Sequence, residues 1–172
     1  MSPDKGCHRA IDVAVKSGLP LKIAGKNREP LEKQYFDEFV APHLSSQIEY
    51  LGEVTHGEKV ELLQNARATL FPIEWEEPFG LVMIEALASG TPVVAMRRGS
   101  VPEILRHGET AMIADDLAGM VAMVDQVGVL DPARLRREAE KRFSVAQMVE
   151  GYLDAYEMLI LGEPEPVLSA VA

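Results

Sequence analysis

The sequence has little cysteine, no run of basic residues and no long apolar stretch. Cys7 is its one cysteine in 172 residues, which excludes an internal disulfide and a cysteine-based metal site. The net charge is −10 without a basic cluster, which argues against nucleic acid as a partner. No stretch is long enough to span a membrane and no signal region is visible, so we expect a cytoplasmic protein. Metal-ligand spacing is absent among the histidines, His8, His43, His56 and His107, so we expect no bound metal.

Short apolar segments alternate with amphipathic ones along the chain. The segments predicted as strands are residues 21–24, 48–51, 69–71, 93–95 and 112–114, and helical patterns lie between and after them. This alternation is typical of an α/β fold with a parallel, doubly wound sheet and helices on both faces. We expect one domain over residues 1–161. Residues 162–172 are predicted to be a tail, because Pro164 and Pro166 cannot continue the last helix.

Helical spacing also predicts which side chains of the first three helices face inward. In the first helix these are Cys7, Ala10, Ile11, Ala14 and Val15. In the second they are Leu31, Tyr35, Phe39 and Val40, and in the third, predicted over residues 59–68, they are Val60, Leu63 and Ala66.

The stretch from Trp75 to Val94 combines an acidic loop, an apolar helix, a glycine stop and a buried strand. Glu77 lies in the loop and Glu85 within the helix, with seven residues between them. The first helical amides, around Gly80, point outward and carry the positive end of the helix dipole, which suits a phosphate. A binding site for a nucleotide-sugar would need an anion site with two carboxylates beside it, because the carboxylates accept hydrogen bonds from the hydroxyls of the ligand.

Seven ordered segments, including the one that contains this glutamate pair, form a pattern along the chain. They are Pro3-Asp4-Lys5-Gly6, Leu21-Lys22-Ile23-Ala24-Gly25, Tyr50-Leu51-Gly52-Glu53-Val54, Phe71-Pro72, the glutamate stretch itself, Gly90-Thr91-Pro92-Val93 and Gly99-Ser100-Val101-Pro102-Glu103. From residue 2 to about residue 161 the chain resembles the C-terminal, donor-binding domain of family-four retaining glycosyltransferases, which have the two-domain GT-B fold. The glutamate pair corresponds to that family's EX7E motif.

The resemblance implies a role for each matching position. Glu85 corresponds to the glutamate that binds the donor ribose, and Glu77 to the one that contacts the donor sugar near the reacting carbon. Lys5 corresponds to the lysine that neutralises the diphosphate as it leaves, so Glu77 and Lys5 are the predicted catalytic residues. The other predicted donor-binding residues are Phe79, Gly80, Leu81 and Val82, through their backbone, and Val54 and Lys59, which would line the base.

Each of these residues also has an ordinary structural explanation. From the residues alone, Glu76 and Glu77 could equally be charges at a helix start, and with the resemblance only Glu77 is expected to be functional. Trp75 is expected to pack against the loop. Glu85 has almost entirely apolar neighbours, which favours a functional role.

The chain departs from the family pattern at its start. The family has an apolar strand ending in Gly-Arg before the segment that matches Met1, and its arginine is the partner of Lys5 on the diphosphate. A smaller departure is Ala111, where the family has a glycine after threonine. Burying about four large apolar side chains contributes roughly 6–12 kcal/mol, comparable to the whole stability of a domain, about 5–15 kcal/mol. We therefore expect the central position of the sheet to be filled by upstream residues supplied separately, by a swapped strand, or by closure of the sheet. The apolar residues 167–171 are a candidate to fill it.

The sequence thus predicts the N-terminally truncated donor-binding half of a hexosyltransferase that uses a nucleotide-diphosphate sugar and no other cofactor. Its expected partner is an N-terminal acceptor-binding domain, without which the chain would bind the donor weakly and transfer little. One alternative is a non-catalytic nucleotide-sugar-binding or assembly module of the same fold, which the missing arginine favours. A further alternative is a sugar-nucleotide epimerase.

Overall fold

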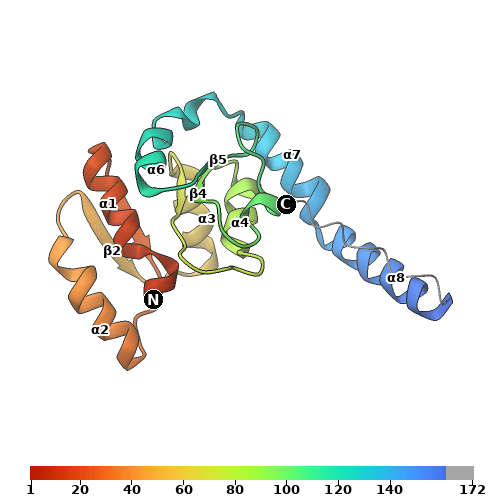
Figure 1. Ribbon diagram of the computed structural model, residues 1–172, viewed down its shortest axis with the longest axis horizontal. Coiled ribbons are helices and arrows are strands. Elements are labelled where there is room, and N and C mark those ends of the chain that lie inside the picture. Colours follow the sequence, from red (N-terminus) through yellow and green to blue (C-terminus); the bar gives the residue numbers. More distant parts are fainter. Residues whose placement is uncertain (162–172) are drawn as a thin grey trace.

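The computed structural model describes residues 1–161 as short strands that alternate with helices (Figure 1). The strands are β1 (Leu21–Ala24), β2 (Ile48–Gly52), β3 (Thr69–Phe71), β4 (Val93–Met96) and β5 (Ala111–Ala114). The α-helices are α1 (Cys7–Ser17), α2 (Pro30–Phe39), α3 (His56–Asn65), α4 (Leu81–Ser89), α5 (Val101–Ile104), α6 (Leu117–Val124), α7 (Pro132–Phe143) and α8 (Val145–Leu161). The 3-10 turns are η1 (Pro3–Lys5), η2 (Ala41–His43) and η3 (Gln126–Val129). All five predicted strands are confirmed to within one residue at each end, and the predicted tail lies outside the described residues.

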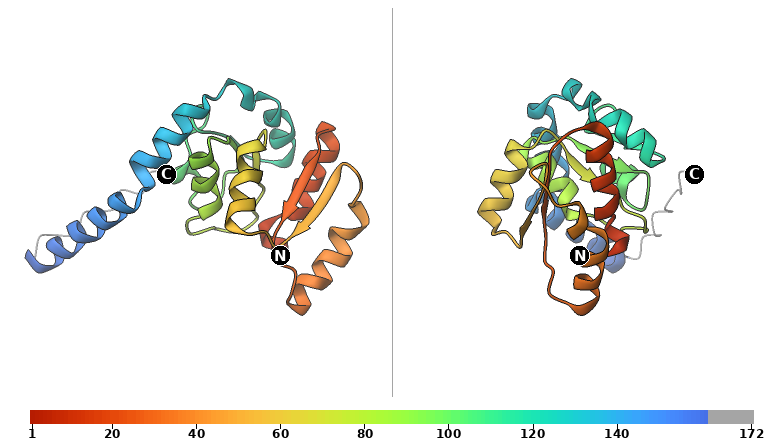
Figure 2. Two further views of the ribbon diagram at one scale, coloured as in Figure 1. Left: turned by 180° about the vertical axis from the view of Figure 1, so that it is seen from behind. Right: turned by 90° about the vertical axis from the view of Figure 1, so that its left-hand side faces the viewer.

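Every strand pairing is parallel, but the strands form two sheets. β1 pairs with β2, with Leu21 opposite Ile48, and β3, β4 and β5 form the second sheet, with Thr69 opposite Val93 and Val93 opposite Ala111. This confirms the predicted α/β class with a parallel, doubly wound arrangement. No strand pairing within residues 1–161 joins β1 to β3, and Figure 2 shows the β1–β2 pair set apart from the larger sheet. Closure of the sheet around its missing strand is therefore the wrong alternative.

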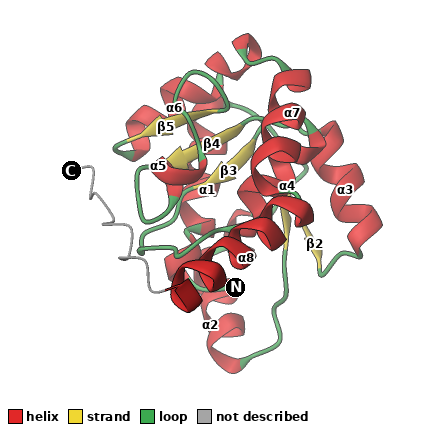
Figure 3. Cartoon of the chain, turned by 90° about the vertical axis from the view of Figure 1, so that its right-hand side faces the viewer, coloured by secondary structure: helices red, strands yellow, loops and turns green. Residues whose placement is uncertain are grey.

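Helices cover both faces of the three-stranded sheet, because side chains alternate along β4. Val93 and Ala95 belong to a core that includes residues of α4 and α7, and Figure 3 shows these two helices on the near side of β3, β4 and β5. Val94 and Met96 belong to a second core that includes residues of α1 and α6. All four side chains are buried. The continuous apolar run of β4 is what a strand covered on both faces requires.

The predicted inward faces of α1 and α2 are partly wrong. On α1, Val15 is 62% exposed, whereas Val13 is fully buried because it packs against the α6 side of the larger sheet. On α2, Tyr35 is buried as predicted, but Leu31 is 79% and Phe39 42% exposed. The reason is that α2 has only the two-stranded sheet and α1 beneath it, and these cover a narrow part of its surface. The remaining predicted positions are buried at Ala10, Ile11, Ala14 and Val40 and half-buried at Cys7.

The third helix begins and ends earlier than its apolar spacing predicts. Thr55 and Glu58 form a capping box that starts α3 at His56, and the helix ends at Asn65. Ala66 is therefore a capping residue outside the helix, and of the three residues predicted to be buried, only Leu63 is.

The last helix, α8, projects from the body of the molecule beyond α7 (Figure 1). The Ser144 hydroxyl accepts a hydrogen bond from the Gln147 amide at 3.3 Å, so Ser144 caps the start of this helix. Much of the apolar surface of α8 is exposed, including Tyr152, Tyr156 and Ile160. None of the helices in residues 1–161 combines the length and apolar character that a membrane crossing needs.

Candidate functional site

The start of α4 lies at the carboxyl edge of the larger sheet, and no side chain of residues 1–161 caps it. Gly80 precedes the helix with a φ of +75°, and its carbonyl accepts the Met83 amide at 2.9 Å. This positive φ favours glycine, and a Cβ at this position would lie 2.7 Å from Cε of Met83 and 3.0 Å from Cζ of Phe71, so these side-chain ends would have to shift. The first turn contains no acidic residue. The positive end of the α4 dipole is therefore not neutralised within the helix.

Glu77 and Lys5, the two predicted catalytic residues, form an ion pair beside this helix start. Nζ of Lys5, at the end of η1, lies 2.5 Å from Oε2 of Glu77 and 4.7 Å above the Trp75 ring. The Glu77 side chain is only 12% exposed, whereas that of Lys5 is 52% exposed. Gly6 allows the η1 turn to approach β3 closely, because a Cβ there would lie 2.1 Å from the Pro72 carbonyl oxygen.

A second loop holds the Glu77 backbone in place. The Ser100 amide donates to the Glu77 carbonyl at 2.9 Å, and the Ser100 hydroxyl donates to the Phe79 carbonyl at the same distance. The carboxylate of Glu76 accepts the Gly99 amide at 2.7 Å. Sequence reasoning missed these positioning contacts, although it had singled out the Gly99-Ser100 segment. The Glu76 side chain thus holds the loop, consistent with its exclusion from the predicted functional residues.

Glu85 and Lys59, both predicted to bind the donor, form a second ion pair. Oε1 of Glu85, on α4, lies 2.6 Å from Nζ of Lys59, on α3. The side chains are 34% and 36% exposed, respectively, so both can be reached by a ligand. Lys59 lies one turn into α3, whose capping box fixes where the helix begins.

The structure brings most of the predicted site residues to one region. The side chain of Glu77 reaches the backbone at the start of α4, since its Cγ is 3.4 Å from where a Cβ of Gly80 would lie. The Phe79 and Leu81 side chains are 41% and 64% exposed, which is compatible with a role for their backbone amides. The two remaining predicted residues, Val54 and Val82, line one cavity together with Lys5 and Lys59.

This region contains two lysine–glutamate pairs, Lys5–Glu77 beside the start of α4 and Lys59–Glu85 one turn further along that helix. Each pair is neutral as it stands, and each ammonium can turn to an anion while its carboxylate turns to a hydroxyl. Residues 1–161 contain no group of three or more histidine, cysteine, aspartate or glutamate side chains placed to hold a metal ion.

The sequence matches a known protein family. Residues 1–127 match the family described as glycosyl transferases group 1. The chain belongs to this family. Its fold is that of the C-terminal domain of GT-B glycosyltransferases, in agreement with the resemblance that the sequence motifs indicated.

The curated relatives that this chain matches are longer than the chain itself. A glycogen synthase of Mycobacterium tuberculosis (strain CDC 1551 / Oshkosh) is 33% identical over 143 residues, which cover 79% of this chain and 34% of that protein. A 2-deoxystreptamine N-acetyl-D-glucosaminyltransferase of Niallia circulans is 30% identical over 140 residues, covering 77% of this chain and 35% of that protein. The chain therefore spans about a third of the length of these relatives.

The solved structures that this chain matches are also longer than the chain. AviGT4, a glycosyltransferase involved in avilamycin A biosynthesis, is 31% identical with a TM-score of 0.76, covering 94% of this chain and 49% of that one. HepE of Anabaena, solved in complex with UDP-glucose, has a TM-score of 0.74 over 91% of this chain and 46% of that one. At 20% identity, HepE shows likeness of fold alone.

Proposed function

We propose that the chain is the donor-binding half of a retaining glycosyltransferase of the hexosyltransferase type. In this proposal it binds a nucleotide-diphosphate sugar, and the complete enzyme transfers the sugar to an acceptor hydroxyl. The observation that carries the proposal is the pair of lysine–glutamate contacts, Lys5 with Glu77 and Lys59 with Glu85, around the uncapped start of α4. Membership in glycosyl transferases group 1 and the UDP-glucose complex of HepE support it.

The donor would replace the internal contacts of the site. The diphosphate takes the Lys5 ammonium and the first amides of α4, while Glu77 accepts a hydrogen bond from the donor sugar. Glu85 accepts hydrogen bonds from the ribose hydroxyls, and Lys59 then lies near the base. The Lys59–Glu85 pair is about one third exposed, and such a pair contributes only about 0–1 kcal/mol, so exchanging it for ligand contacts costs little.

In the proposed transfer step, the bond between the anomeric carbon and the diphosphate oxygen breaks. The acceptor oxygen bonds to the same face of that carbon, and the acceptor proton passes to the leaving diphosphate. Negative charge grows on the diphosphate as the bond breaks. The Lys5 ammonium and the α4 amides stabilise this charge more in the transition state than in the ground state, which is the condition for catalysis.

The acceptor side of the reaction needs a partner domain. Because the chain spans about half of the solved GT-B chains it matches, we infer that an acceptor-binding domain supplies the other wall of the cleft. The chain by itself should therefore bind the donor weakly and transfer little or no sugar.

Titration calorimetry with UDP-, GDP- and ADP-sugars at up to millimolar concentration tests the binding step. We expect weak heat of binding with one of the three, reduced in Glu85→Gln. The matched control is Glu38→Gln, which removes one exposed carboxylate from α2 and should leave binding unchanged. If no sugar nucleotide gives heat, the donor-binding proposal fails. Sugar transfer by the chain alone would instead contradict the need for a partner domain.

A further inference from the structure

Two side chains of different chemistry hold the Lys5 ammonium. Oε2 of Glu77 lies 2.5 Å from Nζ of Lys5, and the centre of the Trp75 ring lies 4.7 Å from it. In the proposed function the donor sugar takes the Glu77 carboxylate, so the ion pair opens. The indole ring has no oxygen that could accept a hydrogen bond from a sugar hydroxyl, so its contact with the ammonium can remain. Trp75 is therefore the partner that Lys5 keeps while the donor binds.

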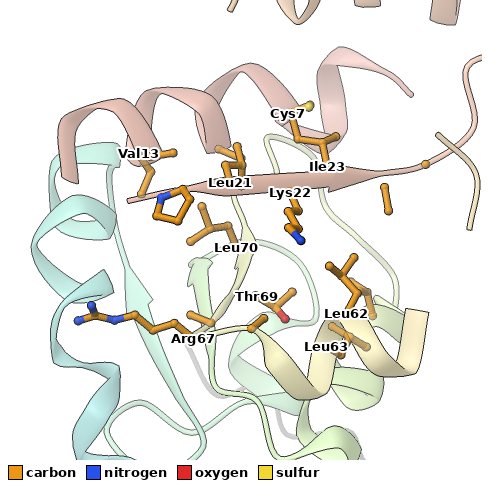
Figure 4. A pocket seen from close by; sticks show the side chains of 18 of the residues that line it. Cys7, Val13, Leu21, Lys22, Ile23, Leu62, Leu63, Arg67, Thr69 and Leu70 are labelled. Atoms are coloured by element: carbon orange, nitrogen blue, oxygen red, sulfur yellow. The ribbon is translucent and has the colours of Figure 1, made fainter. Parts of the chain in front are cut away.

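The cavity between β1 and β3, which Lys5 borders, offers the ammonium no replacement for Glu77. Among the described residues that line this cavity, Glu53 is the only carboxylate, and its side chain pairs with Arg28. Most of the other lining side chains are apolar. Those that Figure 4 labels include Leu62, Leu63 and Leu70. Once Glu77 turns to the sugar, the aromatic ring is thus the contact that keeps the ammonium in place.

Backbone and side-chain contacts fix the ring on both sides. The amide of Glu74 donates to the carbonyl of Asp4, in the η1 turn, at 2.9 Å. The carboxylate of Glu74 pairs with Arg9, on α1. On the other side, the amide of Glu77 donates to the Trp75 carbonyl at 3.0 Å. The loop that carries the ring is therefore tied to the same turn that carries the lysine.

An aromatic ring holds a cation without neutralising it. The negative face of the indole attracts the ammonium, whose full positive charge stays available to an anion. A carboxylate at position 75 would instead neutralise Lys5 and compete with the diphosphate for it. Trp75 is 38% exposed and the Lys5 side chain 52% exposed, so a ligand can reach the ammonium where it lies. This arrangement suits a lysine that must meet a diphosphate.

We propose that Trp75 is a positioning residue, whose ring holds the Lys5 ammonium beside the start of α4 while Glu77 binds the donor sugar. The inference rests on the proposed function, because Trp75 acts on the diphosphate only through Lys5. An exposed contact of this kind should strengthen diphosphate binding by about two- to fivefold. Phenylalanine at this position keeps a ring face and should retain most of the effect.

Affinity measurements on the full chain test the coupling between the two residues. UDP, GDP and ADP are titrated by calorimetry into the wild type, Trp75→Leu and Trp75→Phe, and into Lys5→Met with and without Trp75→Leu. We expect Trp75→Leu to weaken the nucleotide that binds by about two- to fivefold and Trp75→Phe to weaken it less. In the Lys5→Met background, Trp75→Leu should cause no further loss. Tyr152→Leu, which removes an exposed ring from α8, is the control and should leave the affinity unchanged.

The position of Lys5 can also be measured without any ligand. Protons held over the face of an indole resonate upfield, so the ε-methylene protons of Lys5 should be shifted upfield in the wild type. Their resonance is assigned by its loss in Lys5→Met. Trp75→Leu should remove the upfield shift and Trp75→Phe should keep part of it. An unshifted resonance in the wild type would overturn the proposal, because the ring would then not hold the ammonium.

The affinity outcomes separate this inference from the function on which it rests. If none of the three nucleotides binds the wild type, the proposed function fails and the role of Trp75 fails with it. If one nucleotide binds and Trp75→Leu leaves its affinity unchanged, only the role of Trp75 fails. The same holds if Trp75→Leu weakens binding equally with and without Lys5, because the ring would then act on the ligand or on the loop rather than through the lysine.

Discussion

Lys59 on α3 reaches Glu85 on α4, with 2.6 Å between Nζ and Oε1 and about a third of each side chain exposed. The pair connects residues 26 positions apart in the chain. An ion pair this exposed contributes at most about 1 kcal/mol to stability. Because changing it should not unfold the protein, a loss of ligand binding in its variants can be assigned to the site.

The first prediction concerns the carboxylate of this pair. Glu85→Gln should lower the affinity for the sugar nucleotide by roughly tenfold, because hydrogen bonds from ribose hydroxyls to a charged acceptor are stronger than those to an amide. Tm should change by no more than about 4 °C. Calorimetry and thermal unfolding measure the two effects. Equal loss of affinity in Glu38→Gln, on the exposed side of α2, would show that the effect is only one of net charge.

The second prediction separates the diphosphate from the rest of the nucleotide. Lys5→Met should weaken binding of a nucleoside diphosphate by roughly three- to tenfold, because the half-exposed ammonium is partly screened by water. Binding of the corresponding monophosphate should change less, since Lys5 is proposed to neutralise the leaving diphosphate. Lys33→Met, on the exposed surface of α2, is the control. Equal weakening of both nucleotides would place Lys5 away from the diphosphate.

The third prediction concerns the loop that positions Glu77. At Gly99 the φ is +49°, and a Cβ would lie 2.4 Å from the Glu77 amide nitrogen. Gly99→Ala should therefore cost about 1–2 kcal/mol for the left-handed backbone alone, with further loss from the overlap, and it should weaken donor binding. Thermal unfolding and calorimetry measure these effects.

Gly57 provides the matched control for this loop. It lies in the first turn of α3, and a Cβ there would meet no atom within 4 Å. Gly57→Ala should stabilise the protein by up to about 1 kcal/mol, because alanine favours the helix. If Gly99→Ala were as harmless as Gly57→Ala, the loop would not need its close approach to Glu77.

The strands were predictable because their signal is local. Val93, Val94 and Ala95 form a continuous apolar run, which is what a strand covered on both faces requires, and all three are buried. Helix faces were harder to predict, because spacing within one helix does not reveal which neighbours cover it. Val13 and Val15 are two residues apart on α1, yet only Val13 meets the α6 side of the larger sheet.

The site was predictable as a set of residues but not as a set of contacts. The motifs singled out Glu77 and Lys5, but these two lie 72 positions apart, and no spacing rule relates them. The contact between Glu76 and Gly99 likewise depends on how two loops fold against each other. The gap between β1 and β3 was predictable as a missing strand. Whether the sheet closed around it depends on contacts between elements that lie far apart in the chain, and spacing along the chain does not encode these contacts.

The last prediction is a pH dependence at Glu32, which accepts the Met1 ammonium at 2.8 Å and the amides of Arg28 and Glu29 at 3.0 and 3.1 Å. These contacts lower the pKa of its carboxyl from 4.5 to about 2. Because the folded pKa lies below the unfolded one, the stabilisation is complete above about pH 4.5 and is lost as the pH falls through 2. Glu32→Gln removes the charge but keeps a residue suited to the capping box of α2.

The free energy of unfolding of the untagged chain, measured from pH 6 to pH 2 by denaturant titration, checks this prediction. The wild type should be more stable than Glu32→Gln at pH 6, and the difference should shrink steadily between pH 4.5 and pH 2. Glu38→Gln, on the same helix, is the control and should show no such change, because the Glu38 side chain is exposed to solvent. A difference between wild type and Glu32→Gln that stays constant over this range would mean that the Glu32 carboxyl titrates normally and that the contact with Met1 does not persist in solution.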